Sequence, residues 1–207
     1  MKKILYVLLL SITLVGCYSL AQLRGNTYSY SHKLIGESND LVKITDNTYE
    51  DNDIKIGFSF GLKELDFELY NKTESPIKVI WDEASFIPFG EGKKVMHKGV
   101  KYIDRNNAQV PTTIPSKTSL SDLICPTDNV YYRQGYYGTS FSSPGGWETY
   151  DLWLSADMNK PDNEAMIMKL KGLKYKVLLP MEVNGVKKNY TFNFEITDIA
   201  KSAPVTQ

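Results

Sequence analysis

From Leu41 onward, apolar and polar residues alternate along the chain with a period of two. Successive side chains on a strand point to opposite faces, so this period predicts half-buried β-strands. The clearest runs are Ile54–Phe60, Leu65–Leu69 and Ile77–Trp81. Turn-forming residues separate the runs at intervals of about ten residues. The pattern therefore predicts an all-β domain built as an antiparallel sandwich.

One predicted strand changes phase in its middle. Its apolar residues occupy odd positions up to Trp81 and even positions from Ala84 onward. A slip of one residue would move every later side chain to the opposite face, and a β-bulge absorbs such a slip. We therefore expect residues 77–87 to form one bent strand with a bulge near Asp82 and Glu83.

The clearest hairpin lies near the C-terminus. Two alternating runs flank Asn184-Gly185, a pair suited to a type I′ turn because both central residues need positive φ. Pro180 lacks an N–H, so we expect it at a sheet edge or at a bulge. Residues 162–170 fit either a short helix, capped by Asp162 or Asn163, or a continued strand.

The N-terminus follows a different pattern. Lys2 and Lys3 precede an apolar run over residues 4–15, which is shorter than the roughly 20 residues of a membrane-spanning helix. A charged start, a short apolar run and small residues after it are typical of a secretory signal peptide.

The end of this run, Leu14-Val15-Gly16-Cys17, resembles the lipobox of bacterial lipoproteins. The resemblance implies cleavage before Cys17, a diacylglycerol on its thiol and an amide-linked fatty acid such as palmitate. More than one acyl chain gives stable anchoring, so the membrane becomes an expected partner. The alternative is an ordinary signal peptide cleaved after Ala21, because Ser19-Leu20-Ala21 fits a small-x-small site.

These signals give an expected domain organisation. It comprises a signal peptide over residues 1–16, a lipidated cysteine and tether over 17–40, a β-sandwich over 41–199 and a tail over 200–207. Tyr28 and Tyr30 alternate within the tether and leave room for a short edge strand. Tyr18, rather than an aspartate, follows the cysteine. By resemblance to the enterobacterial sorting rule, this favours the outer membrane, with the protein facing the periplasm.

A second resemblance concerns the fold. The stretch Leu65–Thr73 followed by Pro76–Val79 resembles the strand–Asn-x-Thr–strand hairpin of Ig-like envelope domains and small bacterial lipoproteins. It implies an Ig-like β-sandwich and transfers no functional residue. The Asn-x-Thr patterns at Asn71 and Asn189 also match glycosylation acceptors, and in a bacterium we interpret both as coincidence.

Charge and cysteine content narrow the function classes. Without Lys2 and Lys3, the chain carries 22 basic against 24 acidic residues, a net charge of −2. This balance argues against nucleic acid as a partner, because such domains usually show a basic excess. If Cys17 is lipidated, Cys125 has no partner for an internal disulfide, and we interpret it as a small buried hydrophobic residue.

Candidate catalytic and metal-ligating residues are few. His32 falls in the predicted tether and His97 in a Lys/Gly-rich turn, and neither stands in a known catalytic motif. Asp46, Glu50, Asp51 and Asp53 offer oxygen ligands for calcium, but their spacing does not match an EF-hand, so a solvated loop is the simpler interpretation. We therefore predict no enzyme activity, no metal and no cofactor. A hydrolase using Cys125, His97 or the adjacent carboxylates Asp82 and Glu83 remains a third class.

The most distinctive stretch, residues 131–153, interleaves aromatic residues with glycines. Glycine-rich loops rarely build a core, so rings such as Tyr136, Tyr137 and Trp147 are candidates for an exposed ligand-binding surface. Tyr and Trp offer rigid contact area and are enriched at recognition surfaces. The leading hypothesis is a non-enzymatic envelope lipoprotein with a binding or structural role. The alternative is a carbohydrate-binding lipoprotein that uses this loop, so the expected partner is an envelope protein or a glycan.

Overall fold

The computed structural model describes residues 25–139 and 142–203. The predicted signal peptide and Cys17 lie outside these residues. The chain forms two compact units: a larger one of residues 32–152 and 173–196, and a smaller one whose described parts are residues 25–31, 153–172 and 197–203.

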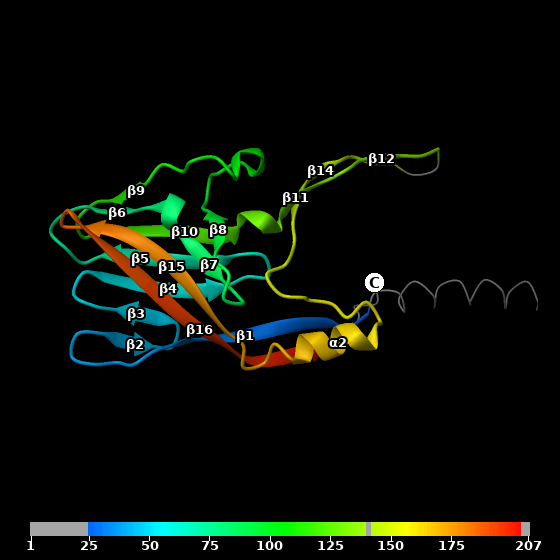
Figure 1. The fold of residues 1–207 in the computed structure, drawn as a ribbon, viewed down its shortest axis with the longest axis horizontal. Helices are drawn as coiled ribbons and strands as arrows, with labels where there is room; N and C mark the ends of the chain where they lie inside the picture. Colours follow the sequence, from blue (N-terminus) through cyan, green and yellow to red (C-terminus); the bar gives the residue numbers. More distant parts are fainter. Residues whose placement is uncertain (1–24, 140–141, 204–207) are drawn as a thin grey trace, which may run out of the picture. The chain divides into compact units, whose positions relative to one another are not determined.

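Within the described residues, a twelve-stranded sheet dominates the structure (Figure 1). Its strands in chain order are β1 Thr27–Ile35, β2 Lys43–Thr45, β3 Thr48–Glu50, β4 Ile54–Phe60, β5 Leu65–Asn71, β6 Ile77–Val79, β7 Ser85–Ile87, β8 Lys93–Met96, β9 Thr112–Ile114, β10 Ser119–Pro126, β15 Lys174–Val183 and β16 Val186–Ser202. The pairings from β2 to β10 and between β15 and β16 are antiparallel. The predicted all-β, antiparallel fold is confirmed.

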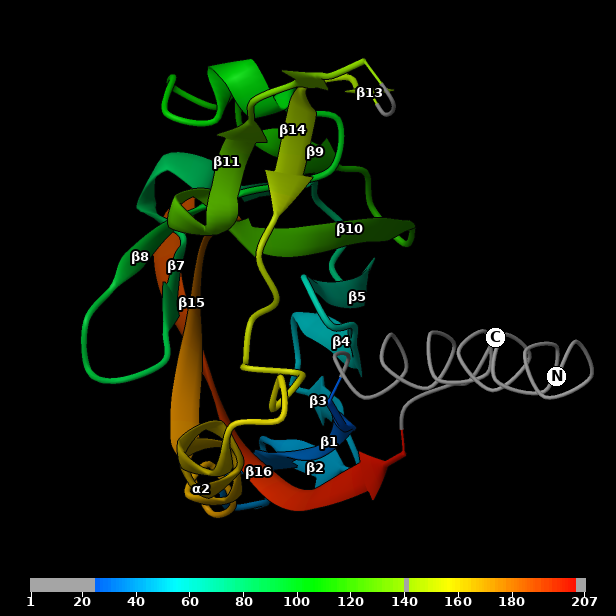
Figure 2. The same ribbon diagram turned by 90° about the vertical axis from the view of Figure 1, so that its right-hand side faces the viewer.

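The core lies between two facing halves of this sheet. Figure 2 shows β15 and β16 on one side and β3, β4 and β5 on the other. Phe58 of β4 contacts Phe192 and Phe194 of β16, with ring centroids 4.9 and 5.0 Å apart. The alternation that predicted β4 and β5 is confirmed, since Ile56, Phe58 and Phe67 are all buried.

The two halves belong to one continuous sheet, joined at a corner by β8. Lys93 and Lys94 of β8 pair with β7, whereas Val95 and Met96 pair with β10. The same four-residue strand thus belongs to both halves. The layers are therefore connected through hydrogen bonds and are not two separate sheets.

The predicted single strand over residues 77–87, with a bulge near Asp82 and Glu83, is wrong in detail. A 3₁₀ turn at Trp81–Glu83 separates β6 from β7, and both strands pair with β15. Between Val79 and Ser85 the chain advances six residues while β15 advances three. The three additional residues are an odd number, so they produce the change of phase seen in the sequence.

The C-terminal hairpin forms as predicted. Asn184 and Gly185 have φ of 51° and 76°, as a type I′ turn requires. Pro180 lies in β15, which is a central strand, and not at an edge. Its carbonyl accepts a hydrogen bond from the N–H of Ile80, next to the 3₁₀ turn. The missing N–H of Pro180 therefore falls where the neighbouring strand is interrupted.

Part of the predicted tether joins the sheet. Residues 27–35 form β1, an edge strand beside β16. The side chain of Asn47, in the β2–β3 turn, accepts a hydrogen bond from Leu34 N at 2.9 Å and donates one to His32 O at 3.4 Å. Asn47 thus satisfies backbone groups on the free side of β1 and links the two ends of the sheet.

The smaller unit is organised around Asp157. Its carboxylate accepts hydrogen bonds from the N–H groups of Asn26 and Asn159, the side-chain amide of Asn26 and the hydroxyl of Tyr28. These bonds, that of the Asn26 amide above all, hold the pKa of Asp157 at about 2. Gly25 has a φ of 67°, and a Cβ there would lie 2.3 Å from this carboxylate.

The ambiguous segment 162–170 contains a helix, α2 at Pro161–Met168. Lys160 occupies the N-cap position and Pro161 the first turn, in place of the predicted caps Asp162 or Asn163. Proline is favoured at that position because the first N–H groups of a helix have no intrahelical partner.

The last strand is longer than the sequence predicted. β16 continues to Ser202, past the predicted start of the tail at residue 200.

Candidate functional site

The described residues of the aromatic, glycine-rich stretch in the larger unit form a two-stranded ribbon. β11 (Val130–Arg133) pairs with β14 (Gly146–Thr149), and β12 (Tyr136–Tyr137) pairs with β13 (Ser142–Ser143). The ribbon extends away from the sheet in Figure 1. The sequence predicted a glycine-rich loop in this stretch, because its paired segments are too short to show a period.

The rings of this ribbon are exposed to solvent. We call them the ribbon aromatics and define them with their exposed fractions: Tyr132 54 %, Tyr136 62 %, Tyr137 80 %, Trp147 36 % and Tyr150 58 %. The predicted candidates Tyr136, Tyr137 and Trp147 all belong to this set. Trp153, at the end of the predicted stretch, is buried and belongs to the smaller unit.

Glycines bring these rings against the backbone. A Cβ on Gly145 would lie 2.7 Å from the Tyr132 hydroxyl, and one on Gly138 would lie 2.8 Å from a ring carbon of Tyr136. A Cβ on Gly135 would come within 3.1 Å of the Tyr137 ring. The rings therefore occupy space that a Cβ would fill, and glycine at these positions lets them lie against the backbone.

Trp147 has neighbours on two sides. The Tyr132 ring packs edge-on against it across the β11–β14 pair, with centroids 5.4 Å apart. The guanidinium of Arg105 lies 4.9 Å from the Trp147 ring centroid, a cation–π distance. No local pattern pointed to Arg105, since it lies more than forty residues earlier in the chain.

The other face of the β11–β14 pair is polar and fixed. Glu148 accepts hydrogen bonds from Arg133 Nε at 2.5 Å and from the Tyr131 hydroxyl at 2.8 Å. These two bonds, the one from Arg133 first, lower the pKa of Glu148. Tyr131 also stacks on Tyr150, with ring centroids 4.1 Å apart. The ribbon thus combines one ionic cluster with several exposed rings.

The structure brings His97 and Asp122 together. His97 Nδ1 lies 3.2 Å from Asp122 Oδ2, and the imidazole stacks on Trp81 with centroids 4.3 Å apart. Asp122 is buried and also accepts the N–H groups of Lys98 and Leu123. His97 lines an open cavity of about 630 Å³. Among the described residues, no serine or cysteine forms a hydrogen bond with this imidazole.

The remaining hydrolase candidates do not converge on His97. Cys125 is buried among Met96 and Val130, and burial raises the pKa of its thiol to about 11. Asp82 accepts the N–H of Gln109, whereas Glu83 pairs with Lys187. A buried thiol with a raised pKa is a poor nucleophile.

The acidic residues considered for calcium are engaged separately. Glu50 pairs with Lys72 at 2.7 Å, and Asp53 pairs with Lys188. Asp51 accepts the N–H groups of Asp53 and Ile54 in the β3–β4 turn. Within residues 25–139 and 142–203, no three His, Cys, Asp or Glu side chains gather as a metal site.

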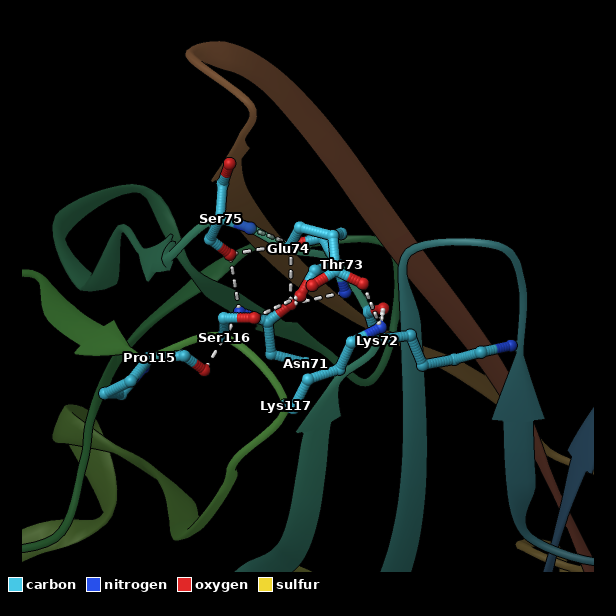
Figure 3. Close-up of polar contacts among 8 residues, drawn as sticks. All are labelled: Asn71, Lys72, Thr73, Glu74, Ser75, Pro115, Ser116 and Lys117. Carbon is cyan, nitrogen blue, oxygen red and sulfur yellow. Dashed lines mark hydrogen bonds and ion pairs between the residues drawn. The ribbon is translucent and has the colours of Figure 1, made fainter.

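Asn71, in the first Asn-x-Thr pattern, is fully buried. Its amide nitrogen donates to the carbonyls of Ser75, Ile114 and Pro115, and its amide oxygen accepts from Thr73. Figure 3 shows Asn71 between the 72–75 turn and the segment from Pro115 to Lys117. This side chain therefore holds two segments together and has no amide nitrogen exposed for glycosylation.

Comparisons with known proteins gave no significant match. No protein-family model matches it, and no curated protein or solved structure is significantly similar to it. In the part of the chain that the structure describes, no helix is long and apolar enough to cross a membrane.

Proposed function

We propose that this protein is a non-enzymatic lipoprotein of the bacterial cell envelope that binds a glycan through its aromatic ribbon. The proposal combines the lipobox-like pattern ending at Cys17 with the ribbon aromatics. The observation that carries the binding role is the exposure of Tyr136, Tyr137 and Trp147 on a paired ribbon whose glycines leave room for the tyrosine rings.

A glycan suits this surface for chemical reasons. The C–H faces of a pyranose ring are apolar and stack on aromatic rings, while its hydroxyls bind nearby polar groups. The ribbon carries both kinds of group, since Arg133 and Glu148 lie on the face of the β11–β14 pair opposite Tyr132 and Trp147. Tyr and Trp also provide large contact areas at a low cost in conformational entropy. A role as a rigid structural element alone would not require exposed rings.

A pull-down on insoluble envelope and plant polysaccharides, followed by tryptophan fluorescence, tests the binding role. We expect saturable binding by the parent protein and a loss of at least about tenfold in Tyr136→Ala and Trp147→Ala, because stacked aromatic anchors dominate such surfaces. Phe89→Ala is the matched control, since Phe89 is 67 % exposed and lies outside the ribbon. Its binding should equal that of the parent.

Two outcomes would count against a glycan. Equal losses in Phe89→Ala and Trp147→Ala would indicate nonspecific adsorption. If no polysaccharide binds, an envelope protein becomes the better candidate for the ribbon, and cross-linking in native envelopes with the same variants would identify it.

The anchor is tested by the intact mass of the protein extracted from membranes. We expect a chain that begins at Cys17 and carries three acyl chains, in the outer membrane and facing the periplasm. Replacement of Cys17 by serine should abolish the lipid mass. An unmodified chain that begins at Gln22 would refute the lipoprotein assignment.

A further inference from the structure

The smaller unit carries all the exposed methionines among the described residues. Residues 25–139 and 142–203 contain five methionines, and the two in the larger unit, Met96 and Met181, are buried. Leu154 of the smaller unit is 42 % exposed, and the other three methionines follow it: Met158 56 %, Met166 59 % and Met168 47 %. We call residues 154–168 the methionine segment. Single exposed apolar residues are ordinary, but this grouping indicates a contact surface.

The backbone at Met158 supports a contact role. Met158 and Asn159 have φ of 51° and 57°, in the left-handed region that asparagine tolerates and methionine rarely adopts. Asp157 holds this turn, because its carboxylate accepts the N–H of Asn159 and its carbonyl accepts that of Lys160. Met158 gains no burial from the unfavourable conformation. A strained backbone at an exposed apolar residue points to contact with another molecule.

The methionine segment covers one face of β1. Tyr28 Oη of β1 donates to the carboxylate of Asp157. Two residues further along the strand, Tyr30 Oη donates to the carbonyl of Leu154. Ser29 lies between the two tyrosines, so its exposed side chain points to the opposite face. The smaller unit therefore has two distinct sides, and the methionine segment with α2 occupies one of them (Figures 1 and 2).

The described chain begins against the methionine segment. A Cβ on Gly25 would lie 2.5 Å from the backbone nitrogen of Met158 and 2.7 Å from that of Asn159, so glycine permits this close approach. Eight residues separate Gly25 from Cys17, the proposed lipid attachment site. Even fully extended, they would span only about 28 Å. A lipid on Cys17 therefore holds Met158 near the membrane surface, where the high effective concentration favours even a weak contact.

The side chains of the segment suit the boundary of a lipid layer. The flexible thioether of methionine adapts to irregular apolar surroundings. The ion pairs of this unit use Lys171 and Lys201, and leave Lys160 and Lys169 without a carboxylate partner among the described residues. Long lysine side chains keep the ammonium group in water while their stems lie along an apolar surface. The described residues of the unit carry equal numbers of basic and acidic side chains, so the methionines and not the net charge favour the lipid.

We propose that Leu154, Met158, Met166 and Met168 insert into the surface of the lipid layer that holds the Cys17 anchor. The inference rests on the lipoprotein assignment proposed above, and it adds a second, noncovalent contact with the same membrane. This contact orients the smaller unit on the lipid surface.

Fluorescence quenching tests the contact in the full, acylated protein, reconstituted in vesicles of phosphatidylethanolamine, phosphatidylglycerol and a doxyl-labelled lipid. Ala165→Cys carries an NBD label, because Ala165 is exposed on α2 and Cys125 is buried. We expect a blue-shifted emission and a loss of roughly half of the fluorescence, as for a probe at the level of the headgroups. The same label at Ser29→Cys, on the opposite face, is the matched control and should stay unquenched.

A second variant changes the methionines and keeps the label. Met158→Ser, Met166→Ser and Met168→Ser together should reduce the quenching at Ala165→Cys at least about twofold, because they remove the apolar surface that inserts. All three side chains are exposed, so the melting temperature should stay near that of the parent.

Equal quenching at the two label positions, or quenching that the three serines leave unchanged, would overturn the proposal. The intact mass of the same preparation separates this result from a failure of the lipoprotein assignment. An acylated chain with an unquenched label refutes the methionine contact alone. A chain without acyl groups refutes the anchor, and with it the contact that rests on the anchor.

Discussion

At the scale of single residues, His32 connects the N-terminal segment to the core. Its imidazole stacks on Phe60, with centroids 4.4 Å apart, and its Nδ1 lies 2.9 Å from the Tyr175 hydroxyl. Burial raises the pKa of Tyr175, so its hydroxyl stays protonated beside Nδ1. Burial also lowers the pKa of His32 from 6.5 to about 4. The folded protein therefore holds His32 in its neutral form.

This shift predicts a pH dependence of stability. Between pH 6.5 and about 4, the unfolded chain binds a proton at His32 that the folded chain does not. Stability is therefore fully present above pH 6.5 and is lost as the pH falls toward 4. We expect a loss on the order of 2 kcal/mol, allowing for the partial exposure of the ring. Urea unfolding of the parent and of His32→Phe at pH 7 and 4.5 measures it. Equal pH dependence in the two proteins would contradict this account.

At the scale of elements, the ribbon depends on where its glycines stand. A Cβ on Gly145 would lie 2.7 Å from the Tyr132 hydroxyl and 2.9 Å from the backbone nitrogen of Gly135. The adjacent Gly146 has nothing within 4 Å of the same position. The two neighbouring glycines therefore differ in their steric role. At Gly145 a side chain would collide with the Tyr132 ring and with the backbone of the paired segment, whereas at Gly146 there is room for a Cβ.

The pair gives a matched test of ring placement. Gly145→Ala should displace Tyr132 and the strand beside it, and should reduce polysaccharide binding about tenfold, because the neighbouring backbone cannot yield cheaply. Gly146→Ala should bind like the parent. Both variants should unfold at the urea concentration of the parent, since the ribbon lies outside the core. If the two variants bind equally well, the glycine contacts do not position the rings.

At the scale of the whole molecule, the large sheet is continuous, and its two ends approach each other within the larger unit. Asn47 supplies the connection, through Leu34 N and His32 O of β1. An edge strand otherwise presents unpaired N–H and C=O groups that invite pairing with other chains. The side-chain amide of Asn47 bonds one N–H and one C=O of β1, as a neighbouring strand would. These two groups are therefore not available for pairing with another chain.

Removal of this connection should destabilise the protein. Asn47→Ala leaves the Leu34 N–H without its partner, so we expect a loss of about 1–3 kcal/mol and faster hydrogen exchange at that amide. Asn52→Ala is the control, because Asn52 is an exposed turn residue of the same type. Unchanged exchange at Leu34 in Asn47→Ala would show that the connection contributes nothing.

The sequence predicted those features that depend on neighbouring residues. Period-two alternation identified β4, β5, β15 and β16, since the period follows directly from strand geometry. The φ requirement of a type I′ turn identified Asn184-Gly185. The aromatic stretch supplied Tyr136, Tyr137 and Trp147 as site candidates. Short segments such as β12 and β13 carry too few residues to show a period, so the ribbon could not be foreseen.

By itself, then, the sequence determined the strand content, the C-terminal turn and the residues that form the aromatic surface, because each follows from local geometry or residue type. Only the tertiary structure decided which distant residues meet. It joined the two halves of the sheet through β8, and it placed His97 beside Asp122 and Arg105 beside Trp147. These contacts span long separations in the chain, and strand order, which no local pattern encodes, brings them together.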